Sequence, residues 1–311
     1  MEKIIITGGF GFIGKNLIDF LSLKYKIVVL DKYIDKKFLK KHIDLNYYEY
    51  DFFKDNNIKE IIEKENPNYI INLISIVSAE RNMNIFNDMI QVNLNILLKL
   101  YEASKGLKGL KLFLQFGSGE EYGNINSPFK ESDREDPNSP YALAKQLTTN
   151  TAIMLNKNYD FPSMVVRPGN LFGKYQSNNK FIPYIINQLF ENKNIETTPG
   201  EQKRDFIYAV DFGRGINLIL ENHSNLLGEI INLSSGKSIS LKEIILFCKG
   251  YINSNSELEF GKIPYRKNEM MDFKLDMSKL KDKTNVNFDV DILGGLKKYI
   301  KILKGDRKWN I

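Results

Sequence analysis

Three side chains in the middle of the sequence have the chemistry to move a proton. Tyr141 and Lys145 are spaced by one helical turn, so both would project from the same face of a helix. Free tyrosine titrates near ~10 and is a poor base at neutral pH, but a nearby ammonium favours the phenolate. We expect Tyr141 to exchange a proton with a substrate hydroxyl while Ser118 hydrogen-bonds the same oxygen. The alternative is an ordinary helix with a chance Tyr/Lys spacing.

A glycine-rich turn near the start of the chain predicts a phosphate site. The segment TGGFGFIG at residues 7–14 follows a β-branched run and opens a helical pattern. Gly8 allows a tight turn, Gly11 lets the backbone approach a pyrophosphate, and Gly14 lets helix and strand pack closely. The first N–H groups of that helix, which include those of Phe12 and Ile13, favour a phosphate. The alternative, an ordinary glycine turn, does not explain why a strand leads in and a helix leads out.

An acidic residue at the end of the second strand predicts which dinucleotide binds. Asp31 can accept both ribose hydroxyls of an adenosine and would repel a 2′-phosphate, so we expect NAD rather than NADP. Lys32 beside it weakens that preference. Asp51 and Phe52, after the third strand, are expected to flank the adenine. The positive nicotinamide ring would then add to the ammonium in favouring the phenolate, and Lys145 would also hold the nicotinamide ribose.

Apolar strands alternate with helices through the first half of the chain, which indicates a parallel sheet covered on both faces. The expected strands are residues 4–6, 27–30, 47–50, 69–73, 110–116 and 163–167, and the expected helices are 16–23, 58–64, 89–104 and 141–157. Right-handed crossovers then give an α/β fold with a doubly wound Rossmann sheet. We expect residues 1–168 to form this dinucleotide domain, with a return near 204–222. Residues 169–311, including a short strand at 229–233, would form a smaller mixed α/β substrate lobe.

Composition excludes several other classes of protein. The 311 residues are 42% hydrophobic and 26% charged, which are values of a globular chain. One cysteine excludes disulfides and thiolate–zinc sites, and two distant histidines offer neither a metal site nor a Ser-His-Asp triad. The net charge of +6 is scattered, which argues against a nucleic-acid partner. With no targeting signal and no apolar run near the ~20 residues that span a bilayer, we expect no membrane contact and a cytoplasmic setting.

At this point the sequence resembles the extended short-chain dehydrogenase/reductase family, in its NAD-dependent epimerase/dehydratase branch acting on nucleotide sugars. The resemblance covers nearly the whole chain. It is carried by TGGFGFIG (7–14), GSGEEYG (117–123), YALAK (141–145), RPGNLFG (167–173), RDFIYAVD (204–211) and YRKNEMMDF (265–273). This ordered set is highly specific for the superfamily.

The resemblance implies roles for residues that local patterns do not single out. Asn170 and Arg204 resemble residues that contact the substrate diphosphate, and Arg266 and Glu269 resemble a pair that binds the phosphate and ribose of the nucleotide. A guanidinium forks onto phosphate oxygens, and a carboxylate accepts ribose hydroxyls. Two alternatives stay open: Arg204 could pair with Asp211, and Glu269 could be a surface acid.

The resemblance also places further residues at the cofactor. Leu73 and Ser75 stand where the family usually has a pair of small residues near the nicotinamide ribose, so local contacts differ here. Arg167, which opens the RPGNLFG motif, is likewise assigned to the cofactor.

The residues after Ser118 favour one reaction over others. Sugar 4,6-dehydratases resemble this scaffold but carry Asp-Glu there, whereas this chain has Gly119 and Glu120, so the acid that protonates the leaving hydroxyl is missing. Glu120 is kept as a catalytic candidate. We expect hydride transfer at C4, as in a 4-dehydrogenase such as those acting on GDP-linked heptoses, or in a 4-epimerase. The alternatives are an NAD(P)H-dependent 4-ketoreductase of a CDP- or dTDP-linked 4-keto-6-deoxy sugar and, from another class, a dinucleotide-binding sensor without catalysis.

The family further implies a homodimer built on a four-helix bundle. The matching segments are residues 89–104 and 141–157, and Leu94, Leu97, Leu98 and Tyr101 could supply an apolar face. The same residues could equally be covered by the sheet of their own subunit.

Overall fold

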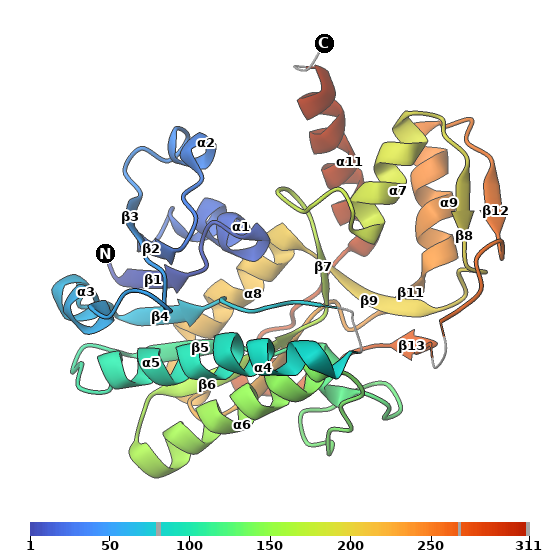
Figure 1. Ribbon diagram of the computed structural model, residues 1–311. Helices are drawn as coiled ribbons and strands as arrows, with labels where there is room; N and C mark the ends of the chain where they lie inside the picture. Colours follow the sequence, from blue (N-terminus) through green and yellow to red (C-terminus); the bar gives the residue numbers. More distant parts are fainter. Residues whose placement is uncertain (79–81, 267–268, 309–311) are drawn as a thin grey trace.

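The computed structural model describes residues 1–78, 82–266 and 269–308, and its centre is a seven-stranded sheet (Figure 1). The strands run in the order β10-β6-β5-β4-β1-β2-β3, and every neighbouring pair is parallel. Their bounds are β1 (Lys3–Thr7), β2 (Lys26–Asp31), β3 (Asn46–Glu49), β4 (Tyr69–Asn72), β5 (Leu112–Phe116), β6 (Ser163–Pro168) and β10 (Ile230–Leu233). This confirms the predicted doubly wound Rossmann sheet.

Helices cover both faces of the sheet, because successive strand residues point to opposite sides. On one face Ile4 and Ile6 pack in a core with residues of α1, α8 and α10, and on the other Ile5 packs with residues of α3, α5 and α6. The helices are α1 (Phe12–Leu21), α2 (Lys36–Leu39), α3 (Ile58–Glu65), α5 (Asn95–Ser104), α6 (Pro140–Tyr159), α8 (Ala209–Glu221) and α10 (Ser278–Thr284). None of the helices in the described ranges is both long and apolar enough to cross a membrane.

The expected helix at 89–104 is not one regular helix. It comprises α4 (Phe86–Met89), a π-helical turn η2 (Ile90–Leu94) and α5. A π-turn has no distinct apolar period, so the sequence pattern does not reveal it. The helix at the glycine turn also differs from expectation, since it begins at Phe12 rather than at residue 16.

The smaller lobe is built on a second sheet of β7 (Asn170–Phe172), β9 (Lys203–Tyr208), β11 (Ser238–Ser240) and β13 (Asp272–Phe273), and on a pair formed by β8 (Ile195–Thr197) and β12 (Leu258–Phe260). Strand β9 contacts all three other strands of its sheet. The helices of the lobe are α7 (Phe181–Phe190), α9 (Leu241–Ile252) and α11 (Ile292–Lys308), which enclose a separate apolar core.

The short strand at 229–233 does not lie where the sequence analysis placed it. It is β10, which pairs with β6 at the edge of the main sheet instead of joining the lobe. The preceding helix α8 packs against α1, so α8 and β10 form one more crossover unit of the Rossmann sheet. A four-residue apolar strand carries no signal for which of two sheets it joins. The change in composition after Pro168 favoured the lobe.

Candidate active site

The glycine turn places the start of α1 beside the carboxyl end of β1. Gly8 has a positive φ of 67°, which favours glycine, and its N–H donates to the Leu30 carbonyl over 2.8 Å. Gly11 is the N-cap of α1, so the N–H groups of Phe12 and Ile13 fall in the first turn, where a helix leaves such donors unpaired. A Cβ on Gly14 would lie 2.4 Å from the carbonyl oxygen of Gly9. The turn and the helix can approach only because no side chain stands between them.

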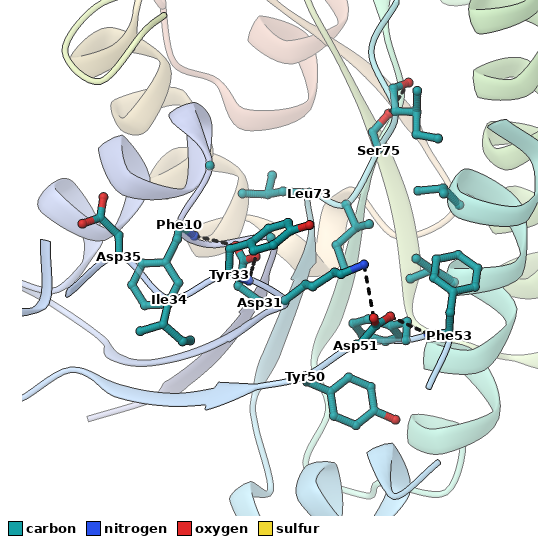
Figure 2. A pocket seen from close by; sticks show the side chains of 18 of the residues that line it. Phe10, Asp31, Tyr33, Ile34, Asp35, Tyr50, Asp51, Phe53, Leu73 and Ser75 are labelled. Carbon is teal, nitrogen blue, oxygen red and sulfur yellow. Dashed lines mark hydrogen bonds and ion pairs between the residues drawn. The ribbon is translucent and has the colours of Figure 1, made fainter. Parts of the chain in front are cut away.

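A cavity of about 680 Å³ runs along the carboxyl ends of β1, β2, β3 and β4 (Figure 2). Predicted cofactor residues that line it are Gly8, Gly11, Asp31, Lys32, Asp51, Phe52, Leu73 and Ser75. Phe12, Ile13 and Gly14 form the first turn of α1 and are not among the described residues that line the cavity. The volume is that of a small-molecule site.

The Asp31 carboxylate is held at the wall of this cavity by backbone donors. Its Oδ2 accepts from the Phe10 N–H over 2.9 Å and its Oδ1 from the Tyr33 N–H over 3.1 Å (Figure 2). Two acceptor oxygens with further lone pairs suit a ribose diol. Together with the glycine turn, whose positive helix end suits a pyrophosphate, the residues present fit a dinucleotide.

Lys32 and Asp51 line the same cavity and pair with each other. The Lys32 ammonium lies 3.2 Å from Asp51 Oδ2, while Asp51 Oδ1 accepts from the Phe53 N–H over 3.0 Å (Figure 2). The predicted effect of Lys32 on the choice between NAD and NADP therefore also depends on Asp51. Phe52 is buried, and its ring packs edge-on against Tyr50.

A second cavity of about 370 Å³ lies between the Rossmann sheet and the lobe. Catalytic candidates Tyr141 and Glu120 line it together with the predicted substrate residues Asn170, Arg204, Arg266 and Glu269. Further lining residues that the sequence analysis did not name are Val77, Ser78, Asn138, Ser139, Lys180, Met270 and Phe273. The structure thus brings six predicted residues from five chain segments into one place.

Tyr141 and Ser118 occupy the predicted positions. Tyr141 lies in the first turn of α6, and Ser118 directly follows Gly117 at the end of β5, where it caps the short helix η3 (Gly119–Tyr122). The Tyr141 hydroxyl hydrogen-bonds with the side chains of Ser118 and Ser75. Because Ser75 also lines the first cavity, this hydroxyl lies at the junction of the two cavities.

In the protein without a bound cofactor the pKa of Tyr141 is raised, and the lowering expected from Lys145 and the nicotinamide ring together stays a prediction. Burial raises the pKa of the Tyr141 phenol well above its usual range, and the charges of Glu120 and Glu121 raise it further, while hydrogen bonds with Ser118 and Ser75 oppose the rise. The Lys145 ammonium instead donates to the Phe116 carbonyl over 2.8 Å, and burial lowers its pKa to about 8. The phenolate therefore depends on positive charge from elsewhere.

Arg167 also lies elsewhere than predicted. Its guanidinium is fully buried, lies 2.7 Å from Glu121 and 2.5 Å from Glu135, and sits over the Tyr122 ring; among the described residues it lines neither cavity. A buried guanidinium requires carboxylate partners, and these two acids supply them. Arg167 therefore supports the loop behind the site instead of reaching the cofactor.

Glu121 is the main site residue that the sequence analysis missed. Its Oε1 accepts from the Ser118 N–H over 2.7 Å and from the Thr149 hydroxyl over 3.0 Å, and it is fully buried. The spacing of Ser118 and Glu121 is that of a capping box, a signal present in the sequence. Asn93 in η2 was also missed; both polar atoms of its side-chain amide are buried without a partner in the described ranges.

The substrate candidates differ in how they are held. Asn170 Nδ2 is buried and has no hydrogen-bond partner in the part of the chain that the structure describes, so it is a donor available to a ligand. Arg204 donates to the Met270 carbonyl over 2.7 Å and pairs with Glu269, not with Asp211, which pairs with Arg214.

Arg266 is exposed at the rim of the second cavity. Residues 267–268 of the YRKNEMMDF motif, between Arg266 and Glu269, lie outside the described ranges.

Comparison with known proteins gives one family but several activities. The model of the NAD dependent epimerase/dehydratase family matches residues 4–234. The dTDP-D-glucose 4,6-dehydratase of Dictyostelium discoideum is 29% identical over 77% of this chain and 60% of its own length. The dTDP-4-dehydro-6-deoxyglucose reductase of Escherichia coli is 27% identical over 97% of both chains. A solved UDP-N-acetylglucosamine 4-epimerase from Methanobrevibacter ruminantium, in complex with UDP-N-acetylmuramic acid, is 25% identical with a TM-score of 0.87, over 98% of this chain and 99% of that one.

Proposed function

Because the chain belongs to the NAD-dependent epimerase/dehydratase family, we propose that it catalyses reversible, NAD-dependent hydride transfer at C4 of a nucleotide-linked sugar. The observation that carries the proposal is the second cavity. One wall holds a proton-transferring phenol, Tyr141, and the others hold the cations Arg204 and Arg266 and the Asn170 side chain, whose Nδ2 has no hydrogen-bond partner among the described residues. Guanidinium groups and an amide donor suit a diphosphate, which would hold the sugar at the phenol.

The proposed reaction gives each residue of the centre a defined task. Tyr141 accepts the proton of the C4 hydroxyl as C4 becomes a carbonyl, and returns it when the carbonyl is reduced. Ser118 hydrogen-bonds the reacting oxygen. Bound NAD supplies the acceptor for the hydride that leaves C4, and its positive ring favours the phenolate. Lys145, whose ammonium donates to the Phe116 carbonyl, would hold the nicotinamide ribose.

Dehydration is disfavoured for a steric as well as a chemical reason. The position of the acid that would protonate a leaving hydroxyl is Gly119, and a Cβ there would lie 2.5 Å from the ring of Phe273 and 3.2 Å from the Pro168 carbonyl. A side chain at position 119 would therefore require the Phe273 ring to move away. Glu120, at the wall of the cavity, can move a proton, but position 119 supplies no acid beside it.

Oxidation of C4 remains our first choice, as a 4-dehydrogenase or a 4-epimerase, because Asp31 lines the cofactor cavity. The second candidate is a 4-ketoreductase of a CDP- or dTDP-linked 4-keto-6-deoxy sugar. It is favoured by the Escherichia coli reductase, which this chain matches over nearly its whole length. The direction of net reaction separates the two.

The experiment is a screen of GDP-, CDP-, UDP- and dTDP-sugars for exchange of the hydrogen at C4. A dehydrogenase would accumulate reduced nicotinamide, an epimerase would interconvert C4 epimers with none, and a ketoreductase would consume reduced cofactor with 4-keto sugars. Tyr141→Phe should lower turnover by roughly 10²- to 10⁴-fold. The matched control is Tyr159→Phe, at an exposed position on the same helix. Absence of exchange with every sugar, or wild-type turnover in Tyr141→Phe, would refute the proposal.

We further propose a homodimer through α5 and α6. Leu98 on α5 and Leu147, Met154 and Tyr159 on α6 are large apolar residues that are exposed in the single chain, whereas Leu97 is covered by its own sheet. Sedimentation should show a dimer in the wild type and a monomer in Leu147→Glu. Leu293→Glu, at an equally exposed position on α11, is the control. A monomeric wild-type protein would contradict this proposal.

A further inference from the structure

We propose that two lysine–aspartate ion pairs beside Asp31, Lys15–Asp35 and Lys32–Asp51, make the cofactor cavity reject a 2′-phosphate, and that neutralising Asp35 would let the cavity accept the 2′-phosphorylated dinucleotide. The inference concerns cofactor choice alone. It rests on the dinucleotide site and not on the sugar or the reaction proposed above.

Five charged side chains line the adenosine end of this cavity, namely Asp31, Asp35, Asp51, Lys15 and Lys32. Asp31 is the last residue of β2, and Asp35 and Asp51 lie on the loops that follow β2 and β3 (Figure 2). The carboxylates outnumber the ammonium groups, so the wall carries net negative charge when all five are ionised. A phosphate dianion placed at the ribose would be repelled by Asp31 and would find no unpaired cation among these five residues.

The Lys15–Asp35 pair is held from several sides. Lys15 Nζ lies 2.5 Å from Asp35 Oδ2, and Lys15 is only 17% exposed. The ammonium also lies 5.9 Å from the centre of the Phe38 ring and 5.7 Å from that of Tyr175, distances at which aromatic faces attract cations. Lys15 projects from the first half of α1, next to the glycine turn, so without its partner it could turn toward the ribose.

Asp35 has a second task that the experiment must preserve. Its Oδ1 accepts from the Phe38 N–H over 2.9 Å and caps α2, which fixes the loop after β2. The hydrogen bond from Lys15 and that from the Phe38 backbone both lower the pKa of Asp35, so it is ionised at neutral pH. Asparagine is as good an N-cap as aspartate but carries no charge. Asp35→Asn therefore removes the ion pair while leaving the cap.

The second ion pair, Lys32–Asp51, occupies the other lysine at the wall of this cavity. Lys32 follows Asp31 directly, and its ammonium is bound by Asp51 across the cavity. The Asp51 carboxylate is itself fixed by the Phe53 N–H. The two lysines at the wall of this cavity, Lys15 and Lys32, are thus both paired with an acid, and specificity comes from these paired cations as well as from the repulsion by Asp31.

The test measures binding of NAD and NADP to the purified full chain by titration calorimetry. In Asp35→Asn the affinity for NADP relative to NAD should rise about tenfold or more, the effect of one hydrogen bond between a lysine and a phosphate. Glu201→Gln is the matched control, since it makes the same change in net charge and frees Lys242, 3.1 Å away on the surface of the lobe. It should leave the ratio unchanged.

A double variant identifies the responsible cation. Lys15→Met combined with Asp35→Asn should return the affinity ratio to that of the wild type. The proposal is overturned if Asp35→Asn leaves the ratio unchanged, or if the gain persists without Lys15. Thermal unfolding of each variant checks the fold. Should Asp35→Asn prove unstable, Asp51→Asn tests the second pair by the same ratio, because asparagine keeps an acceptor for Phe53. An unchanged ratio in that variant would then overturn the proposal.

Discussion

The Glu121 carboxylate accepts a hydrogen bond from the backbone N–H of Ser118 over 2.7 Å, from a position with no exposure to solvent. The same carboxylate is bound by Arg167 and by the Thr149 hydroxyl. Burial raises the pKa of Glu121, and the charge of Arg167 opposes that rise. The orientation of Ser118, which hydrogen-bonds with Tyr141, thus depends on a buried ion pair that lies behind the site.

Replacement of this carboxylate should affect turnover and stability together. Glu121→Gln keeps the shape and one acceptor oxygen but leaves Arg167 with Glu135 alone. Breaking a buried pair on one side typically costs about 3–5 kcal/mol, and we expect a loss of this size in the free energy of unfolding. We also expect kcat to fall with little change in KM, because Ser118 is no longer held. Urea denaturation and steady-state kinetics measure the two effects.

The control for this change is Glu135→Gln, which removes the other partner of Arg167. Glu135 is 16% exposed and pairs with Arg167 and Gln146, so in this variant the Ser118 N–H keeps the Glu121 carboxylate as its acceptor. Its loss of stability should be smaller and its kcat near that of the wild type. Equal losses of kcat in the two variants would show that Glu121 does not position Ser118.

A second prediction follows from the raised pKa of Tyr141. The free protein should show no tyrosinate from this residue near neutral pH, since burial and two carboxylates hold its pKa high. A bound nicotinamide adds positive charge and should lower that pKa. The ultraviolet difference spectrum between wild type and Tyr141→Phe, titrated with and without NAD, measures the shift. A tyrosinate signal at neutral pH without NAD would contradict the prediction.

A third prediction concerns the pH dependence of stability. Burial lowers the pKa of Lys145 to about 8, whereas an unfolded lysine titrates near ~10.4. Between these values the unfolded chain binds more protons than the folded one, so the contribution of Lys145 to the free energy of unfolding rises with pH. Below about pH 8 the cost of burying its ammonium is present in full.

Lys145→Met should therefore be most stabilised, relative to the wild type, below pH ~8, and this advantage should shrink as pH approaches ~10. Urea denaturation on both sides of that window provides the comparison. Lys59→Met, at an exposed position of α3, is the matched control. An advantage that grows with pH would have the wrong sign.

A fourth prediction compares two helical glycines. Gly14→Ala in α1 would place a Cβ 2.4 Å from the Gly9 carbonyl, so it should cost ~1–3 kcal/mol and weaken NAD binding. Gly250→Ala in α9 meets nothing within 4 Å and should stabilise the protein by roughly 0.5–1 kcal/mol. Thermal unfolding and NAD titration of both variants make the comparison. Similar behaviour at the two positions would remove the steric argument for the glycine turn.

The parts of the site that the sequence predicts are those governed by local order. The glycine turn, Asp31 and the Tyr141–Lys145 pair each depend on neighbours a few residues away, and the strand and helices that carry them form as predicted, except that α1 begins at Phe12 instead of residue 16. The assignment of the strand predicted at 229–233 failed because its place beside β6 depends on the path of the chain through α8, which the strand itself does not reveal. The π-turn around Asn93 has no apolar period of its own.

The ion pairs and pKa shifts of the site, in contrast, could not be predicted from the sequence. Glu121 pairs with Arg167 across a long stretch of chain, and the pKa of Tyr141 depends on how deeply α6 and β5 bury it. Burial is a property of the assembled fold, so no spacing rule in the sequence contains it. The same holds for Lys15 and Asp35, whose pairing needs α1 and the loop after β2 to meet.

Strand β9 presents neighbouring side chains in opposite directions. Arg204 lines the second cavity, whereas Asp205 is fully buried and accepts hydrogen bonds from Ser234, Ser235 and the backbone of Leu275. A shift of β9 by a single residue would exchange the positions of these two side chains. The acid would then line the cavity where a diphosphate is expected, and the arginine would lie among the hydrogen-bond donors that now hold Asp205. Insertions or deletions between α7 and β9 should therefore be tolerated only where the connecting segments absorb them without shifting β9.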